Sequence, residues 1–177
     1  IKYLADYGIE DVFLVYGAAN GDLVDAFTRN DKIRYIAVMH EQGGGFAAEG
    51  HSKISGKIGV AMATSGPGGM NFVTPIGNCF YDSVPCLFIT GQINSKFMRP
   101  DESIRQIGFQ ETDIVSITKP ITKFSYQLKN PNEIRYILEK AWQSKKPKIS
   151  RHNFHSFYGQ KKKNPLKGLQ IKIITKH

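Results

Sequence analysis

The chain has 177 residues, of which 41% are hydrophobic and 22% are charged, so it is long enough to bury one core. No apolar run reaches membrane-spanning length, which excludes a predicted transmembrane helix and favours a soluble globular domain. Residues 1–143 hold 14 Lys and Arg against 15 Asp and Glu, whereas residues 144–177 hold 10 Lys and Arg and no acid. This break predicts a nearly neutral domain over 1–143 and a basic tail over 144–177.

Strand and helix patterns alternate through the first half of the chain. Apolar or β-branched runs predict strands, and the segments between them carry helical patterns. The strands are expected over 11–15, 33–39, 58–64 and 85–90, and the helices over 21–28, 41–55 and 68–81. We expect the 33–39 run to be buried. This order predicts an α/β fold, a doubly wound parallel sheet with helices on both faces in a single domain.

The second half begins with a polar stretch, 91–108, which we expect to be a long surface loop bordering a site. A short helix near 110–117, an edge strand over 122–128 and a helix over 131–143 follow, the last with Asn130 as its N-cap.

The basic tail does not continue this pattern. Its last stretch, 169–175, alternates enough to be compatible with a strand. Nonspecific, salt-dependent binding of nucleic acid is one interpretation of its charge. A disordered or aberrant terminus is the interpretation we favour, because basic runs are usually solvated.

Cys79 and Cys86 are the only cysteines, which argues against a disulfide framework. We expect them to be small core residues in a reducing cytoplasm. The first residues show neither a basic region nor a cleavage site, so no signal peptide is predicted.

Two glycine-rich segments follow predicted strands, His40-Glu41-Gln42-Gly43-Gly44-Gly45 and Thr64-Ser65-Gly66-Pro67-Gly68-Gly69-Met70-Asn71. Glu41 stands where a strand becomes a helix, at the carboxyl end of a parallel sheet. Open α/β sheets bind their ligands at this edge. Two such exits in one small domain therefore predict a shared cleft.

Other interpretations of these residues remain open. Glu41 at a helix N-terminus also stabilises the helix dipole by about 0.3–1 kcal/mol, and His40 is expected to cap that helix. The loop at 66–69 resembles a phosphate cradle but lacks the Lys-Ser/Thr ending of a P-loop. Arg99 and Arg105 are expected to be solvated loop charges, with binding of a substrate carboxylate as the alternative.

The body resembles the N-terminal pyrimidine-binding domain of thiamine-diphosphate-dependent enzymes of the acetolactate synthase type. The resemblance covers residues 1 to about 143, and the two glycine-rich segments in tandem are its most specific part. The matching segments are Gly8-Ile9-Glu10-Asp11-Val12-Phe13 with Tyr16-Gly17-Ala18-Ala19, residues 40–50, residues 64–71, Gly108-Phe109-Gln110-Glu111-Thr112-Asp113 and Lys119-Pro120-Ile121-Thr122-Lys123.

The resemblance implies a role for each match. Glu41 aligns with the glutamate that activates the cofactor. Residues that border the aminopyrimidine ring of thiamine diphosphate or reach it are implied at Gly17, Ala18, Pro67, Asn71 and Gln110. Residues on the substrate side are implied at Phe109 and Lys123, and none of these residues is implied to bind a metal.

Thiamine diphosphate attacks carbonyl groups through a thiazolium carbon that must first lose a proton. A carboxyl group bonded to the pyrimidine ring favours the tautomer whose own nitrogen accepts that proton. Such a carboxyl must exchange a proton near neutral pH, and burial raises a carboxyl pKa in that direction. We expect Glu41 to be buried enough for this role.

The chain departs from the family in three places. Tyr16 and Ala18 replace residues of the usual Pro-Gly-Gly-Ala turn. Lys145-Lys146-Pro147-Lys148 stands where a Gly-Pro-Val strand normally ends the domain. The Gly-Asp-Gly stretch that holds the diphosphate and Mg²⁺ is missing from this sequence.

These departures imply that a second subunit or partner chain would hold the diphosphate and Mg²⁺, with FAD possible in the parent family. The implied protein is a homo-oligomer acting on small 2-oxo acids such as pyruvate, by carboligation or decarboxylation. We expect this chain alone to be inactive, as a truncated or frameshifted piece. Other thiamine-diphosphate enzymes and a non-catalytic interaction remnant are the alternatives, and a membrane or nucleic-acid partner is not expected.

Overall fold

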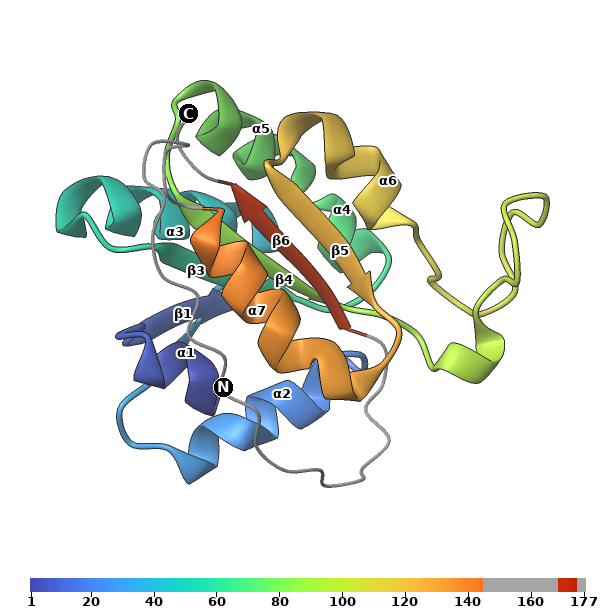
Figure 1. The fold of residues 1–177 in the computed structure, drawn as a ribbon, viewed down its shortest axis with the longest axis horizontal. Coiled ribbons are helices and arrows are strands. Elements are labelled where there is room, and N and C mark those ends of the chain that lie inside the picture. Colours follow the sequence, from blue (N-terminus) through green and yellow to red (C-terminus); the bar gives the residue numbers. More distant parts are fainter. Residues whose placement is uncertain (145–168, 175–177) are drawn as a thin grey trace.

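The structure is a computed structural model that describes residues 1–144 and 169–174. Its centre is a six-stranded sheet in the order β2-β1-β3-β4-β6-β5 (Figure 1). The strands are β1 (Asp11–Leu14), β2 (Arg34–Ala37), β3 (Gly59–Ala63), β4 (Cys86–Gly91), β5 (Phe124–Leu128) and β6 (Leu169–Ile174). The first four strands pair in parallel, as the alternation of strand and helix patterns predicted.

Helices and short 3₁₀ turns connect the strands. The α-helices are α1 (Lys2–Asp6), α2 (Gly21–Asp25), α3 (Glu41–Ser55), α4 (Pro67–Met70), α5 (Val73–Tyr81), α6 (Ile114–Thr118) and α7 (Ile134–Gln143). The 3₁₀ turns are Ala26–Arg29, Ser95–Phe97, Lys119–Ile121 and Pro131–Glu133. Among these described helices, none is long and apolar enough to cross a membrane.

The helices cover both faces of the sheet, because alternate residues of the central strands point to opposite sides. Val60, Met62 and Leu87 belong to one buried cluster, which also contains residues of α1 and α7. Ala61 and Phe88 belong to a second cluster with residues of α3 and α5. Figure 1 shows α7 in front of the sheet and α3 and α5 behind it. The predicted doubly wound architecture is confirmed.

The expectation that residues 33–39 form a buried strand is wrong. All four residues of β2 are exposed, and Met39 after it is 101% exposed. The run is rich in β-branched and aromatic residues, but β2 lies at the end of the strand order and pairs only with β1 within the described chain. An edge position, which residue composition does not report, leaves it uncovered.

Two predicted helices differ in extent. The pattern over 68–81 is divided into α4 and α5, with Asn71 and Phe72 between them. The helix expected near 110–117 begins at Ile114, because Asp113 caps it by accepting a hydrogen bond from Ser116 N at 3.0 Å. Residues 110–113 therefore remain outside the helix, free to take part in a site.

The tail contributes one strand to the sheet. β6 lies between β4 and β5 and runs antiparallel to both, so the compatibility of 169–175 with a strand is confirmed for 169–174. The predicted edge position of β5 is also confirmed. Residues 145–168 and 175–177 lie outside the described residues, as do the interpretations of that part of the tail as disordered, aberrant or nucleic-acid-binding.

Both cysteines are free and buried, Cys79 on α5 and Cys86 at the start of β4, as expected for small core residues. The Cys79 side chain hydrogen-bonds Cys86, and together with burial this raises the pKa of the Cys86 thiol. A raised pKa keeps this thiol protonated and unreactive.

Candidate functional site

The carboxyl ends of the parallel strands bring most of the predicted site residues, Lys123 excepted, to one edge of the sheet. Glu41 is the first residue of α3, shortly after β2, and the segment at 64–71 directly follows β3. His40 Nδ1 accepts a hydrogen bond from Gln42 N at 3.2 Å and caps α3, as predicted. Glu41 is thereby held at a helix start that lies at the carboxyl edge of the sheet.

Glu41 and Asn71 form the centre of this arrangement. Asn71 Nδ2 donates to Glu41 Oε2 at 2.8 Å. Among the described residues, the other carboxylate oxygen, Oε1, accepts no hydrogen bond. Both side chains are only partly buried, so the burial expected of Glu41 is incomplete within this chain. The carboxylate has one oxygen fixed by the protein and one available to a ligand.

The turn after β1 lies against the segment after β3. Asn20, which is 1% exposed, accepts from Gly17 N at 2.8 Å and donates to Val15 O at 2.9 Å, so it locks the turn. Ala19 N donates to Thr64 Oγ1 at 3.2 Å. A Cβ on Gly17 would stand 2.5 Å from Thr64 Cβ, so this close approach requires glycine.

The segment after β3 reaches both Glu41 and the loop at 108–113. A Cβ on Gly68 would stand 3.2 Å from Glu41 Oε1, and one on Gly66 would stand 2.7 Å from Gln110 O. Gly66 has φ +58°, and Gln110 has φ +60°, an uncommon value for a residue that carries a side chain. Gln110 is therefore held in a costly conformation beside the Gly66 turn.

The remaining predicted residues lie at different distances from this centre. Ala18, Pro67 and Phe109 are exposed around it, Phe109 with 84% of its surface accessible. Lys123 lies elsewhere. It precedes β5, which has the same direction as β4, and the register places the first residue of β5 level with the first residues of β4. Within one chain Lys123 is thus at the amino edge of the sheet, opposite Glu41.

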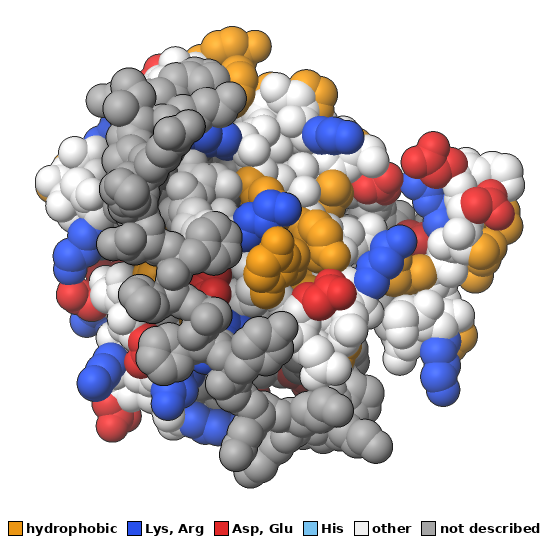
Figure 2. Space-filling model, in the orientation of Figure 1, with side chains coloured by type: hydrophobic (Ala, Val, Ile, Leu, Met, Phe, Trp, Pro, Cys, Tyr) orange, Lys and Arg blue, Asp and Glu red, His pale blue; other side chains and the backbone are white. Residues whose placement is uncertain are grey.

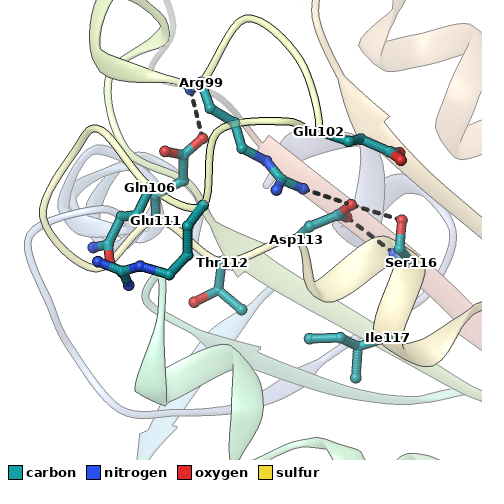
Figure 3. A pocket seen from close by; sticks show the side chains of 9 residues that line it. Arg99, Glu102, Gln106, Glu111, Thr112, Asp113, Ser116 and Ile117 are labelled. Atoms are coloured by element: carbon teal, nitrogen blue, oxygen red, sulfur yellow. Dashed lines mark hydrogen bonds and ion pairs between the residues drawn. The ribbon is translucent and has the colours of Figure 1, made fainter.

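The long loop between β4 and α6 projects from the body at the right of Figure 1, and Figure 2 shows basic and acidic side chains on this projection. Between this loop and α6 lies a cavity of about 610 Å³, lined by Arg99, Glu102, Arg105, Gln106, Glu111, Thr112, Asp113, Ser116 and Ile117 (Figure 3). Thr112, one of the lining residues, is held by Gln92, whose Nε2 donates to Thr112 O at 3.1 Å.

The two arginines of the loop differ in their contacts. Arg99 donates from its backbone N to Glu111 Oε1 at 2.8 Å, and its guanidinium lies 3.4 Å from Asp113 Oδ2 (Figure 3). Arg105 is exposed and donates to the neighbouring Gln106 side chain at 3.1 Å. The structure therefore gives Arg99 a role in holding the loop and leaves Arg105 as the solvated charge that the sequence predicted.

Two site residues were not predicted from the sequence, Asn20 and Thr64. Thr64 is the first residue of one singled-out segment and Asn20 directly follows another, and each accepts a hydrogen bond from the backbone of the turn after β1, Asn20 from Gly17 N and Thr64 from Ala19 N. A polar residue at the end of a glycine-containing turn was the available signal for Asn20. No local signal pointed to Thr64, because its partner is 45 residues away along the chain.

Comparison with known proteins agrees with this geometry. The family model described as "Thiamine pyrophosphate enzyme, N-terminal TPP binding domain" matches residues 1–117. The acetolactate synthase large subunits of Lactococcus lactis and Corynebacterium glutamicum are 42% and 40% identical to this chain over 142 residues. The chloroplastic acetolactate synthase of Arabidopsis thaliana is 41% identical over 142 residues.

Each alignment covers 80% of this chain but only 24%, 22% and 20% of the three relatives, respectively. The chain thus spans between a fifth and a quarter of the length of the proteins it matches. The family model covers well over half of the chain and includes Glu41, Asn71 and Gln110. This chain belongs to the thiamine pyrophosphate enzyme family and contains its N-terminal, acetolactate-synthase-like TPP-binding domain.

Proposed function

We propose that this chain is the pyrimidine-binding domain of an acetolactate-synthase-like enzyme that joins or decarboxylates 2-oxo acids such as pyruvate. The observation that carries the proposal is the Glu41–Asn71 pair at the carboxyl edge of the sheet, with one carboxylate oxygen open. The names of the relatives support the reaction class.

The residues present fit an aminopyrimidine ring. A ring nitrogen needs a carboxyl partner, and Glu41 Oε1 has no partner among the described residues. Gly43 has no atom within 4 Å of where a Cβ would be, so the first turn of α3 is open to a flat group. Ala18 and Pro67 are exposed in the turns after β1 and β3, and we assign them to the border of the same opening.

The chain's own residues perform three tasks in this proposal. Asn71 fixes the orientation of the Glu41 carboxyl by donating to Oε2, which leaves Oε1 to hold or release a proton at the ring. The Gly66–Gly68 turn keeps side chains away from Oε1. Phe109 and Gln110 border the side on which a 2-oxo acid would arrive. Thiamine diphosphate, when bound, supplies the nucleophilic carbon that attacks the carbonyl group.

We propose that a second subunit completes the site. This subunit would supply the ligands of the diphosphate and Mg²⁺, and its own Lys123 would lie near the substrate. The expected assembly is therefore a homo-oligomer. Exposed apolar side chains beside Glu41 support this, since Ile36, Met39 and Phe46 are 37%, 101% and 41% exposed. FAD remains possible in the complete enzyme.

We place the protein in the cytoplasm, which its two free cysteines support. Other thiamine-diphosphate enzymes, namely oxo-acid decarboxylases, oxidases and sulfoacetaldehyde acetyltransferase, are alternative identities that product analysis of the complete enzyme separates. A non-catalytic interaction module is the second candidate function, and the exposed apolar side chains of Ile36, Met39 and Phe46 are the observation that favours it.

The chain alone is expected to show no turnover of pyruvate with thiamine diphosphate and Mg²⁺. Turnover that Glu41→Gln abolishes would contradict this. The site itself is tested with thiamine, which lacks the diphosphate, by following the Asn71 side-chain amide in NMR spectra. We expect millimolar thiamine to shift this signal in the unsubstituted chain and not in Glu41→Gln. An unchanged signal in both refutes the proposed pyrimidine site.

A further inference from the structure

Helix α3 lies along α4 and α5 through residues that are spaced one helical turn apart. On α3 these are residues 41, 45, 49 and 53, and their partners are Asn71, Pro75, Asn78 and Asp82. Residue numbers rise together on both sides, so the two segments run in the same direction. The front of this seam is the Glu41–Asn71 pair, and the rest of it determines where that pair stands.

The rear of the seam repeats the chemistry of the front. Asn78 Nδ2 lies 2.8 Å from both Oε1 and Oε2 of Glu49. Lys53 Nζ lies 2.6 Å from Glu49 Oε1 and 2.8 Å from Asp82 Oδ2, and these two carboxylates raise the pKa of Lys53. Two carboxylate–carboxamide pairs therefore link α3, at positions two turns apart, to the α4–α5 segment: Glu41 to Asn71 at the junction of α4 and α5, and Glu49 to Asn78 within α5.

The two pairs differ in burial. Glu49 is 3% exposed, whereas Glu41 keeps one oxygen open. A buried carboxylate is costly unless each oxygen is paired, so Glu49 tolerates little displacement from Asn78 and Lys53. Buried polar pairs of this kind specify the register of packed helices, because a slip by one turn leaves the charge unpaired.

The middle of the seam fixes the separation of the helices rather than their register. A Cβ on Gly45 would stand 2.4 Å from Pro75 Cγ, so the two backbones are in close approach there. Apolar contact of this kind has no strong preference along the helix axis. At the far end, Ser52 Oγ donates to Pro85 O at 2.9 Å and ties α3 to the entry of β4.

We propose that Glu49 is a positioning residue. With Asn78 and Lys53 it fixes the register of α3 along α4 and α5, and so holds Glu41 at hydrogen-bonding distance from Asn71. Its importance for a bound pyrimidine rests on the proposed function, but the positioning itself does not.

The test reads the Asn71 side-chain amide in NMR spectra of the full chain without ligand. Asn71→Asp identifies the signal, and Glu41→Gln shows where it moves when the charged acceptor is lost. We expect Glu49→Asp, which shortens the carboxylate by one methylene, to move the Asn71 signal toward its position in Glu41→Gln. Asn78→Ala is a second variant at an exposed position and is expected to move the signal the same way.

A double variant that keeps the summed length of the two side chains tests whether the Asn71 signal can be rescued. Glu49→Asp combined with Asn78→Gln restores the total length of the two side chains and is expected to return the Asn71 signal. Ile137→Val, in the cluster on the other face of the sheet, is the matched control for lost stability and should leave the signal in place. An Asn71 signal unmoved in folded Glu49→Asp and Asn78→Ala overturns the proposal. If the Asn71 signal moves as expected in the Glu49 and Asn78 variants but the unsubstituted chain does not bind thiamine, the result counts against the pyrimidine site alone.

Discussion

Replacing Gly45 by Ala tests whether α3 and α5 are packed as closely as the structure requires. The added Cβ would stand 2.4 Å from Cγ and 2.7 Å from Cβ of Pro75, and 3.2 Å from Phe88 Cε1. Pro75 is a rigid ring on a buried helix face, and Phe88 is fully buried, so neither neighbour can move aside freely. Overpacking of this kind costs about 1–3 kcal/mol in the free energy of unfolding.

Gly50 provides the control in the same helix. No atom lies within 4 Å of its Cβ position, so Gly50→Ala gains only the helix propensity of alanine, about 1 kcal/mol. Gly45→Ala has the same gain but also the clash, so the two variants should differ by about 1–3 kcal/mol. With about 2–4 °C of Tm per kcal/mol for a chain of this size, the difference in Tm is about 2–12 °C.

Thermal unfolding followed by circular dichroism, together with urea titration, measures this difference. We expect Gly50→Ala to melt above the unsubstituted chain and Gly45→Ala to melt below Gly50→Ala. Equal stabilisation by the two substitutions would show that α3 stands further from α5 than the structure has it. The close contact of α3 with α5 that helps to position Glu41 would then be contradicted.

Three further predictions concern the core, the response to acid and the tail. Phe88→Ala, at a fully buried position, should lower the free energy of unfolding by about 3–5 kcal/mol, whereas Phe109→Ala, at an exposed position, should change it by less than about 0.5 kcal/mol. Urea titration measures both values, and equal losses would contradict the difference in burial. Lys57 holds the pKa of Glu10 below its ordinary 4.5, so the ion pair stabilises the fold above pH 4.5, and this stabilisation is lost as the pH falls through the folded-state pKa. Glu10→Gln should therefore flatten the fall in Tm below pH 4.5. An unchanged fall would refute the pairing. Lys172→Pro removes a backbone donor from a strand paired on both sides, so it should lower the Tm far more than Lys172→Ala, which keeps the N–H; similar values would mean that β6 contributes little to the sheet.

Much of the fold could be predicted because the signals were local. The bounds of α3 agree with the sequence pattern, and its glycines and its His40 cap lie within the segment itself. The parallel order of β1 to β4 follows from strands separated by helices. The burial of β2 could not be predicted, because Tyr35 and Ile36 fit an inner strand as well as an edge strand.

The candidate site divides in the same way. Glu41, Asn71, Gly17 and Gln110 were singled out from glycine-rich segments and from the family resemblance, and the structure brings them to one edge. Lys123 was grouped with them, but the direction of β5 places it at the opposite edge of a single chain. Thr64 belongs to a singled-out segment, but no role was predicted for it.

The sequence by itself determined the family, the alternation of strands and helices, and the position of Glu41 at the start of a helix. These depend on residue types within short segments, where turn, cap and periodicity rules act. The tertiary structure alone decided which residues meet across the chain: Asn71 with Glu41, Asn78 and Lys53 with the buried Glu49, and Gly66 with Gln110. Such pairings depend on how helices and strands register against one another, and that register is set by packing and by the need to pair buried polar groups rather than by any one segment.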